Sequence, residues 1–294
     1  ATYIMAARTE ALEYLPEGAD IDALSWDDVM QWGMNLEEAT GERLLGLPFG
    51  EDGLRHRLLQ GYLYPSFTGK VNNEFATQAG VDMWNWLTEL WPYVNPQSTT
   101  YSFMQEPLQS GEVWVAWDHT ARLIDALNAD PEGFTAFPVP AGPEGRAFMP
   151  VIAGLAIPAT APDPEGAKEA IKFLLEPETQ GLTLANVSFF PVAAGEVPAD
   201  VGPGVMAQMG AISGQSGAPD ALPALLPIGL GDQGGAYSGV FQDALKAIIV
   251  DGGDPAQVTA DLAPTLQAIF DSENAPCWSP DEVVEGQPCV VGTP

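Results

Sequence analysis

Two periodicities of apolar and polar residues run along the chain, one typical of short buried strands and one typical of amphipathic helices. Tyr3 to Ala7 is an apolar run that predicts a strand near the start. Glu112 to Trp117 is a second, rich in Val and Trp, and predicts a central parallel strand buried on both faces. Apolar residues then recur at helical spacing up to Leu127, after the favourable N-cap residues Asp118 and Thr120. A strand is therefore expected to pass directly into a helix.

This strand-to-helix junction is the first candidate site. In open α/β sheets, ligands bind at the carboxyl ends of the strands, where free N–H groups and the positive end of the helix dipole face a crevice. Trp117, Asp118, His119 and Arg122 occupy the junction here. A simpler interpretation remains open for Asp118, in which its side chain only caps the helix.

Other segments supply further elements around this junction. Ser25 with Asp28 approximates a capping box, and Gly41 is placed to end that helix. Residues 44–49 read as a strand that ends at G-E-D-G, and residues 54–63 follow with three basic side chains among leucines. One of the three is His56, and a single histidine on such a segment is often a packing or surface residue.

Charge and composition narrow the class of protein. The 294 residues include 40 Asp and Glu against 10 Lys and Arg, a formal net charge of -30. This charge repels phosphate backbones and anionic lipid headgroups, so nucleic acid and membrane surfaces are poor partners. Adaptation to salt is another interpretation of the same composition. No apolar run reaches the length of a membrane helix, and the start at Ala1 without Met suggests that upstream residues were removed.

Only two cysteines occur, Cys277 and Cys289, in a Pro-rich tail with little else to hold it. We expect a disulfide between them, which would close a loop of about a dozen residues and indicate an oxidising, extracytoplasmic location. Two free thiols are the alternative.

A series of short motifs then indicates a family. It comprises S-W-D-D-V near residue 25, L-Q-S-G-E-V-W-V-A-W near 110, A-F-P-V-P-A-G-P-E-G near 136, A-G-L-A-I-P at 153 followed by P-E-G-A-K-E-A-I-K-F-L-L-E-P-E-T-Q, and F-F-P-V at 189. In this order and spacing the chain resembles the family 1 extracellular solute-binding proteins, the carbohydrate-binding components of ABC importers. Each motif is weak alone, and the ordered series is specific.

The resemblance implies an α/β fold of two lobes, the periplasmic-binding-protein-like fold, with a sugar held between lobes that close by hinge motion. Residues 1–150 would form the first part of the C-terminal-type lobe, 151–219 a remnant of the N-terminal-type lobe, and 220–294 a return to the C-terminal-type lobe plus the tail. Val151 to Ile157 resembles a strand that crosses between lobes. Because the family pattern has a longer segment before Tyr3, we expect the N-terminal lobe to be incomplete and to leave residues 151–157 and 165–175 apolar and exposed.

The resemblance also assigns sugar-binding positions in three segments. They are Glu51, Asp52, Arg55 and His56 in the first, Trp117, Asp118, His119 and Arg122 in the second, and Gln233 and Tyr237 in the third. Aromatic rings suit the C–H face of a sugar, and planar charged groups suit its hydroxyls. The implied partners are a carbohydrate and the membrane permease of an ABC importer. The protein would be an extracytoplasmic monomer without catalytic activity, cofactor, metal or bound nucleic acid.

Two other classes of function remain as alternatives. Glu51, Asp52 and Asp118 could supply the carboxylate pair of a carbohydrate-active hydrolase. Alternatively, the same scaffold could dock a protein partner without binding any small ligand. Turnover of sugar oligomers would indicate the hydrolase, and saturable stabilisation without turnover would indicate the binding protein.

Overall fold

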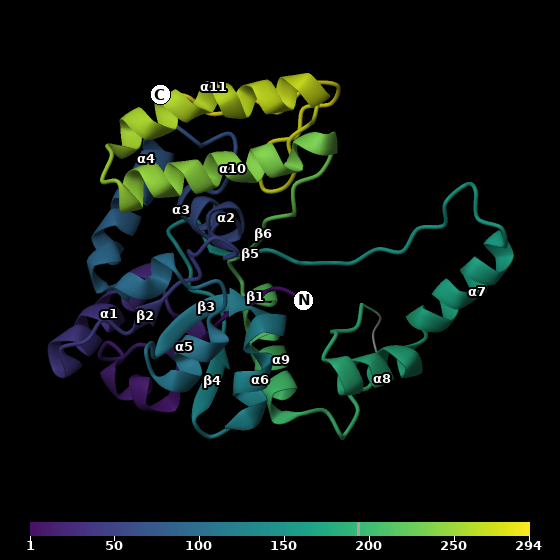
Figure 1. Cartoon of the computed structure of the whole chain (residues 1–294), viewed down its shortest axis with the longest axis horizontal. Helices are drawn as coiled ribbons and strands as arrows, with labels where there is room; N and C mark the ends of the chain where they lie inside the picture. The colour runs from purple at the N-terminus through teal and green to yellow at the C-terminus, as the bar shows by residue number, and fades with distance from the viewer. Residues whose placement is uncertain (193–194) are drawn as a thin grey trace.

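The computed structural model describes residues 1–192 and 195–294, and a mixed four-stranded sheet lies at its centre (Figure 1). The strands of this sheet lie in the order β2-β3-β1-β4. They are β1 (Tyr3–Arg8), β2 (Leu45–Gly46), β3 (Val115–His119) and β4 (Phe134–Phe137). A separate parallel pair consists of β5 (Arg146–Phe148) and β6 (Ala221–Pro223).

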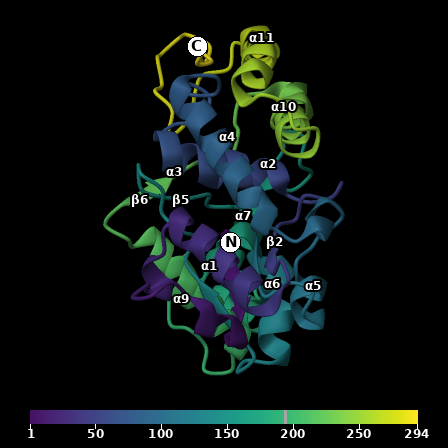
Figure 2. The same ribbon diagram turned by 90° about the vertical axis from the view of Figure 1, so that its left-hand side faces the viewer.

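Helices cover both faces of the sheet and form a further layer beyond one end of it (Figures 1 and 2). In chain order they are α1 (Trp26–Thr40), α2 (Arg55–Leu58), α3 (Tyr64–Thr68), α4 (Gln78–Leu90), α5 (Gln105–Ser110), α6 (Thr120–Ala129), α7 (Pro164–Leu175), α8 (Pro177–Val187), α9 (Pro203–Ser216), α10 (Gly234–Leu245) and α11 (Pro255–Glu273). Short π-helical turns extend α2 over Leu59–Leu63 and α10 over Lys246–Val250.

The predicted central strand is present, but its bounds and pairing differ from the prediction. β3 begins at Val115 rather than Glu112, because the turn that ends α5 occupies the preceding residues. It is parallel to β2 and antiparallel to β1, so the prediction of a parallel strand holds for one neighbour only. Tyr3 pairs with His119 in this register, which brings the start of β1 to the carboxyl end of β3.

Successive residues of β1 enter two different cores, as expected of a strand buried on both faces. Met5 and its odd-numbered neighbours pack into the larger core, which also holds the buried faces of α1, α4 and α10. Ile4 and Ala6 pack into a smaller core together with Leu123 of α6 and Ala211 of α9. The sheet is therefore the middle of three layers, as the α/β prediction required.

Local signals in α1 behave as the sequence indicates. The Ser25 hydroxyl accepts a hydrogen bond from the Asp28 N–H, and the Asp28 carboxylate accepts one from the Ser25 N–H, so the capping box is complete. Gly41 ends the helix in the left-handed conformation at φ 76°. Both ends of this helix are thus determined by adjacent residues.

Residues 151–192 and 195–201 differ from the rest of the described chain in their packing. Val151 to Ile157 forms no strand and runs extended away from the main body to α7, which lies apart beside α8 (Figure 1). By contrast, α9 packs against α6, β4 and β1. The last part of the predicted 151–219 unit therefore lies on the same sheet as residues 1–150.

The predicted apolar surface on this segment is confirmed. Large apolar side chains that are mostly exposed cover α7, α8 and the segments beside them. They are Ile152, Leu155, Phe173, Leu174, Leu175, Leu182, Val187, Phe189 and Val192. Some of them line an open hollow of about 400 Å³ with Ile171 and Pro191.

The C-terminal tail is held by covalent and polar contacts. Cys277 and Cys289 form the predicted disulfide, with a sequence separation of 12 residues. The buried carboxylate of Asp281 accepts hydrogen bonds from the backbone N–H groups of Val71, Asn72 and Asn73 and from the Asn72 side chain. The tail is therefore fixed against the loop that precedes α4.

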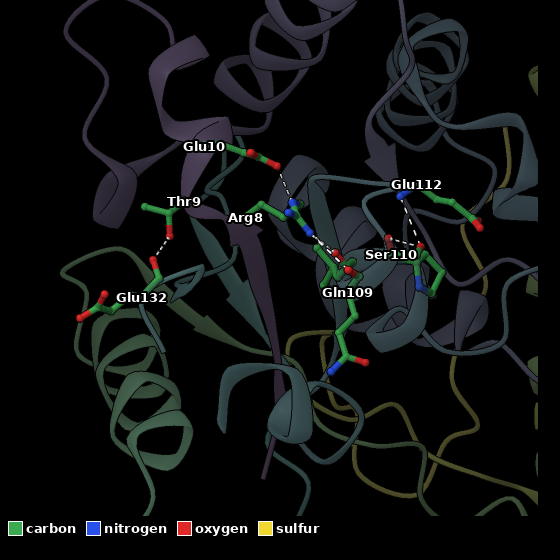
Figure 3. Close-up of polar contacts among 9 residues, drawn as sticks. Arg8, Thr9, Glu10, Gln109, Ser110, Glu112 and Glu132 are labelled. Carbon is green, nitrogen blue, oxygen red and sulfur yellow. Dashed lines mark hydrogen bonds and ion pairs between the residues drawn. The ribbon is translucent and has the colours of Figure 1, made fainter. Parts of the chain in front are cut away.

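Arg8 is the last residue of β1, at the end of the strand opposite to Tyr3. Its guanidinium donates to the Leu108 and Gln109 carbonyls and pairs with Glu10 at 2.6 Å, while Thr9 donates to the Glu132 carbonyl (Figure 3). These side-chain contacts tie the end of β1 and the residue after it to α5 and to the loop before β4.

We predict that Asp281→Asn lowers the free energy of unfolding by about 2 kcal/mol, because an amide nitrogen would replace one acceptor of a buried, charge-assisted network. Urea unfolding measures the change. Glu282→Gln is the matched control, since that neighbouring side chain is exposed. Equal stability of the two variants would contradict the anchoring role of Asp281.

A second prediction separates the buried core from the exposed apolar face. Phe241→Ala should cost about 3–5 kcal/mol, because Phe241 is fully buried. Phe173→Ser should change stability by no more than about 0.5 kcal/mol and reduce binding of an apolar dye, because Phe173 is 58% exposed. A large loss of stability in Phe173→Ser would show that α7 is covered in solution.

Candidate functional site

Asp118 lies at the carboxyl end of β3 and is fully buried. One carboxylate oxygen accepts the Met104 N–H at 2.9 Å, and the other accepts the His119 N–H at 2.7 Å. Burial raises the pKa of Asp118 to about 6, against the lowering effect of these two bonds and of Arg122. The simpler interpretation, in which Asp118 only caps α6, is wrong, because its side chain instead ties the start of α5 to β3.

His119 provides the cap of α6. Its Nδ1 accepts the Ala121 N–H at 3.1 Å, which requires an unprotonated Nδ1. The ring also meets the edge of Tyr3 at a centroid distance of 5.0 Å. Burial, with a contribution from the charge of Arg122, lowers the pKa of His119 to about 4. His119 is therefore neutral near pH 7.

Arg122, in the first turn of α6, joins two loops to the junction. Its guanidinium donates to the Ser102 carbonyl at 2.8 Å and to the Asp52 carbonyl at 3.5 Å. It also lies over the Phe103 ring, 4.2 Å from the ring centroid. The first and second predicted segments are therefore in contact through this side chain.

α2 brings a second set of basic side chains to the same place. It follows a tight turn at Gly53, where an added Cβ would lie 1.9 Å from the Pro48 carbonyl oxygen, so only glycine fits. Arg55 then donates to the Phe49 and Gly50 carbonyls, both at 2.8 Å. His56 Nδ1 lies 3.1 Å from the side-chain nitrogen of Gln242 on α10.

These side chains form what we call the basic cluster: Arg55, His56, Arg57, His119 and Arg122. All are half-buried. Burial and the charges of the neighbouring arginines lower the pKa of His56 to about 4. Burial raises the pKa of Tyr3 to about 12, while the charges of Arg57 and Arg122 oppose that rise. Near pH 7 the positive charge of the cluster therefore comes from its three arginines, because the low pKa values of His56 and His119 keep both rings neutral.

The structure does not place an accessible ring at Trp117. The indole is fully buried and stacks on Tyr3 at a centroid distance of 4.8 Å and an angle of 4°. Tyr62 meets the indole edge-on at 5.3 Å and also contacts the Tyr3 ring at 5.6 Å. The prediction that Trp117 offers a stacking face is wrong, because the inward face of β3 is covered by aromatic side chains.

Tyr237 is likewise buried, and its hydroxyl donates to the Asn72 side chain at 2.9 Å. It packs against Phe270 and Trp278 in the helical layer, so it is a core residue rather than a sugar contact. Gln233 is half-buried just before α10 begins. It lies nine residues before Gln242, roughly 13 Å along a helix axis, which separates it from His56.

Glu51 and Asp52 are exposed on the loop before α2. Beside them, Arg122 also lines an open hollow of about 760 Å³. Phe103, which is 52% exposed, and Tyr101 supply aromatic surface to this hollow. The hollow is continuous with the basic cluster through Arg122 and combines ring faces with charged groups.

Sequence reasoning did not assign three residues that the structure places here: Arg57, Gln60 and Phe103. Arg57 carried a usable signal, since it is one of only ten Lys and Arg residues and adjoins two assigned positions. Gln60 and Phe103 carried none, because their roles depend on contacts with distant segments.

Among residues 1–192 and 195–294, no group of three or more His, Cys, Asp or Glu side chains is positioned to hold a metal ion. Within the same residues, no helix combines the length and the apolar character that crossing a bilayer requires.

Comparison with known proteins identifies the class. The fold is similar to maltose-bound MalE3 of T. maritima, with a TM-score of 0.64 and 20% identity over 91% of this chain and 70% of that one. It is also similar to UgpB of Mycobacterium tuberculosis, solved in complex with glycerophosphocholine, with a TM-score of 0.69 and 19% identity over 92% of this chain and 68% of that one. For the sugar-binding protein MalE of Xanthomonas citri, the TM-score is 0.68 and the identity 13%, over 92% of this chain and 69% of that one. No curated protein matches the sequence.

The fold is therefore the mixed α/β periplasmic-binding-protein fold. The model of the family described as "Bacterial extracellular solute-binding protein" matches residues 1–181, and the chain belongs to that family. Its members are non-catalytic, extracellular or periplasmic proteins that bind solutes for ABC transporters. The predicted family and the predicted absence of enzymatic activity are confirmed by this match, and the hydrolase alternative is excluded.

We predict a specific pH dependence from His56. Its pKa is about 4 in the folded protein and 6.5 when unfolded, so between these values only the unfolded state takes up the proton. The free energy of unfolding should therefore fall as pH decreases from 6.5 to 4, by up to about 1 kcal/mol per pH unit from this group. Urea unfolding of wild type and His56→Gln across that range measures the difference, and parallel curves would contradict the prediction.

Proposed function

We propose that the protein captures a sugar or oligosaccharide outside the cytoplasm and delivers it, as a monomer, to the membrane permease of an ABC importer. Family membership supports solute capture, and several structural neighbours are sugar-binding by their own descriptions. The glycerophosphocholine complex among them indicates that the same fold also accepts a phosphorylated polyol.

The observation that carries the proposal is the meeting of three separate segments at the carboxyl end of β3. Arg122 bonds to the loops at Asp52 and Ser102, and His56 lies against Gln242 of α10. In open α/β sheets this is the position at which ligands bind. The adjoining hollow offers ring faces for the C–H surface of a sugar and charged groups for its hydroxyls.

The proposal gives different roles to the assigned residues. Arg122, His56, Glu51 and Asp52 remain candidates for hydroxyl contacts, because their side chains are at least partly exposed. Phe103 replaces Trp117 as the candidate stacking ring. Asp118 and His119 position the junction, and Gln233 would contribute only to a solute long enough to reach the start of α10.

Phe103→Ala tests this assignment. We expect at least a tenfold weaker saccharide affinity, about 1.4 kcal/mol, in calorimetry over a panel of mono-, di- and trisaccharides. Phe189→Ala is the matched control, because Phe189 is 50% exposed but lies beyond α8. Wild-type affinity in Phe103→Ala would remove this ring from the site.

The same panel tests the function itself. Saturable binding without turnover supports a transport-binding role. If no member of the panel shifts the melting temperature or gives heat, the sugar assignment fails, and the scaffold that only docks a protein becomes the better account.

A further inference from the structure

The basic cluster gathers positive charge with almost no carboxylate partners. Three of the ten Lys and Arg residues lie in it and carry its charge, although 40 Asp and Glu residues are available. Both histidines of the chain also lie in it, and they are neutral near pH 7. Among the described residues, its one ion pair joins Arg122 and Asp118 at 3.8 Å. Glu51 and Asp52 lie nearby, but neither forms an ion pair with it within that part of the chain. Like charges held together repel one another, so a bound anion would relieve this arrangement.

Arg57 is the least committed member of the cluster. Its guanidinium donates to the Gln60 side-chain oxygen at 3.1 Å and has no other hydrogen-bond acceptor among the described residues. A guanidinium carries five N–H donors in a planar fork that matches the oxygens of phosphate and carboxylate. Most of that capacity is unused in Arg57, which is half-buried.

Gln60, the hydrogen-bond partner of Arg57, carries a buried donor that has no partner among the described residues. In the described part of the chain, the buried side-chain nitrogen and oxygen atoms that lack a hydrogen bond are Arg55 Nε, Gln60 Nε2 and Trp117 Nε1. Gln60 is 2% exposed, and its side-chain oxygen accepts the hydrogen bond that holds Arg57. Trp117 stacks on Tyr3, and the charge of Arg57 opposes the rise in the pKa of Tyr3 that burial causes. The unpaired atom of Gln60 is a donor, which suits a ligand group that only accepts.

Arg8 shows how this chain treats an arginine with a structural role. It has a carboxylate partner, Glu10 at 2.6 Å, and two carbonyl acceptors at the other end of β1 (Figure 3). Among the described residues, Arg57 has neither a carboxylate nor a backbone carbonyl acceptor, and its one acceptor is the side-chain oxygen of Gln60. The difference between the two arginines indicates that Arg57 is kept for a group from outside the chain.

We propose that the solute is anionic, a sugar or polyol that carries a phosphate or carboxylate group, and that Arg57 binds this group with support from Gln60, His56 and Arg122. The inference rests on the proposed transport-binding function and specifies its substrate class. The neutral part of the solute would extend past Arg122 towards Phe103 and the hollow. A phosphate ester and a uronic acid share the recognised chemistry, so the experiment includes both.

Calorimetry on the full chain tests the proposal with four probes: maltose, glucose 1-phosphate, a digalacturonate and inorganic phosphate. Titrations at low and at physiological ionic strength show whether binding is electrostatic. Arg57→Gln should weaken binding of a charged sugar at least tenfold. Arg43→Gln removes one positive charge at an exposed position and should change the affinity for the charged sugar less than twofold.

Stability distinguishes a binding role from a structural one. Removing a repelled cation should leave the melting temperature of Arg57→Gln unchanged or higher, whereas a structural arginine would lower it. Gln60→Met is the second variant. It should lower the affinity for the charged ligands several-fold, because it removes the buried donor and the hydrogen bond that holds Arg57. An NMR titration gives a further readout. Bound inorganic phosphate should raise the pKa of His56, because a nearby anion favours the protonated ring.

The outcomes separate the two proposals. Preferential binding of glucose 1-phosphate or digalacturonate over maltose, lost in Arg57→Gln, supports the anionic assignment and shows which anion is used. Maltose binding that equals or exceeds theirs and is unaffected in Arg57→Gln overturns it and leaves the transport function standing. If neither charged sugar nor inorganic phosphate binds, the anionic assignment fails, and the panel of mono-, di- and trisaccharides decides the sugar-binding role separately.

Discussion

The antiparallel pairing of β1 with β3 is the contact on which the rest of the structure depends. β1 lies inside the sheet, and its alternate residues enter two cores, so the helices on either face are positioned relative to one strand. The register brings Tyr3 opposite His119 and thereby places the start of the chain at the carboxyl end of β3. A shift of the register by one residue would move Met5 and Ile4 into the wrong cores, and Tyr3 would no longer lie opposite His119.

The site is built by side chains that hold backbone rather than by the rings first expected to hold a ligand. Asp118 fixes the start of α5, His119 caps α6, and Arg122 joins two loops. These contacts consume most of the polar capacity at the junction. Arg57 and the buried donor of Gln60 are what remains available, which is why they carry the argument for an anionic solute.

α7 and α8 show the opposite situation, in which secondary structure is complete but packing is not. Asp163 caps α7 and Pro164 follows at its first position, so the helix is well specified locally. Its apolar side chains are nevertheless exposed, because the segment that leads to it runs away from the sheet (Figure 1). Helix formation and burial are therefore independent properties of this segment.

The sequence by itself determined the elements whose causes are local: the capping box and glycine stop of α1, the apolar run of β3, the disulfide tail, and the ordered motifs of the family. Only the tertiary structure decided which face of an element is covered. Trp117 and Tyr237 have the composition of ligand contacts, but Tyr3, Tyr62 and Trp278 bury them. The partners of Asp118 and Arg57 were also undetermined, since a side chain's hydrogen bonds depend on residues far away in the chain, and no local period encodes them.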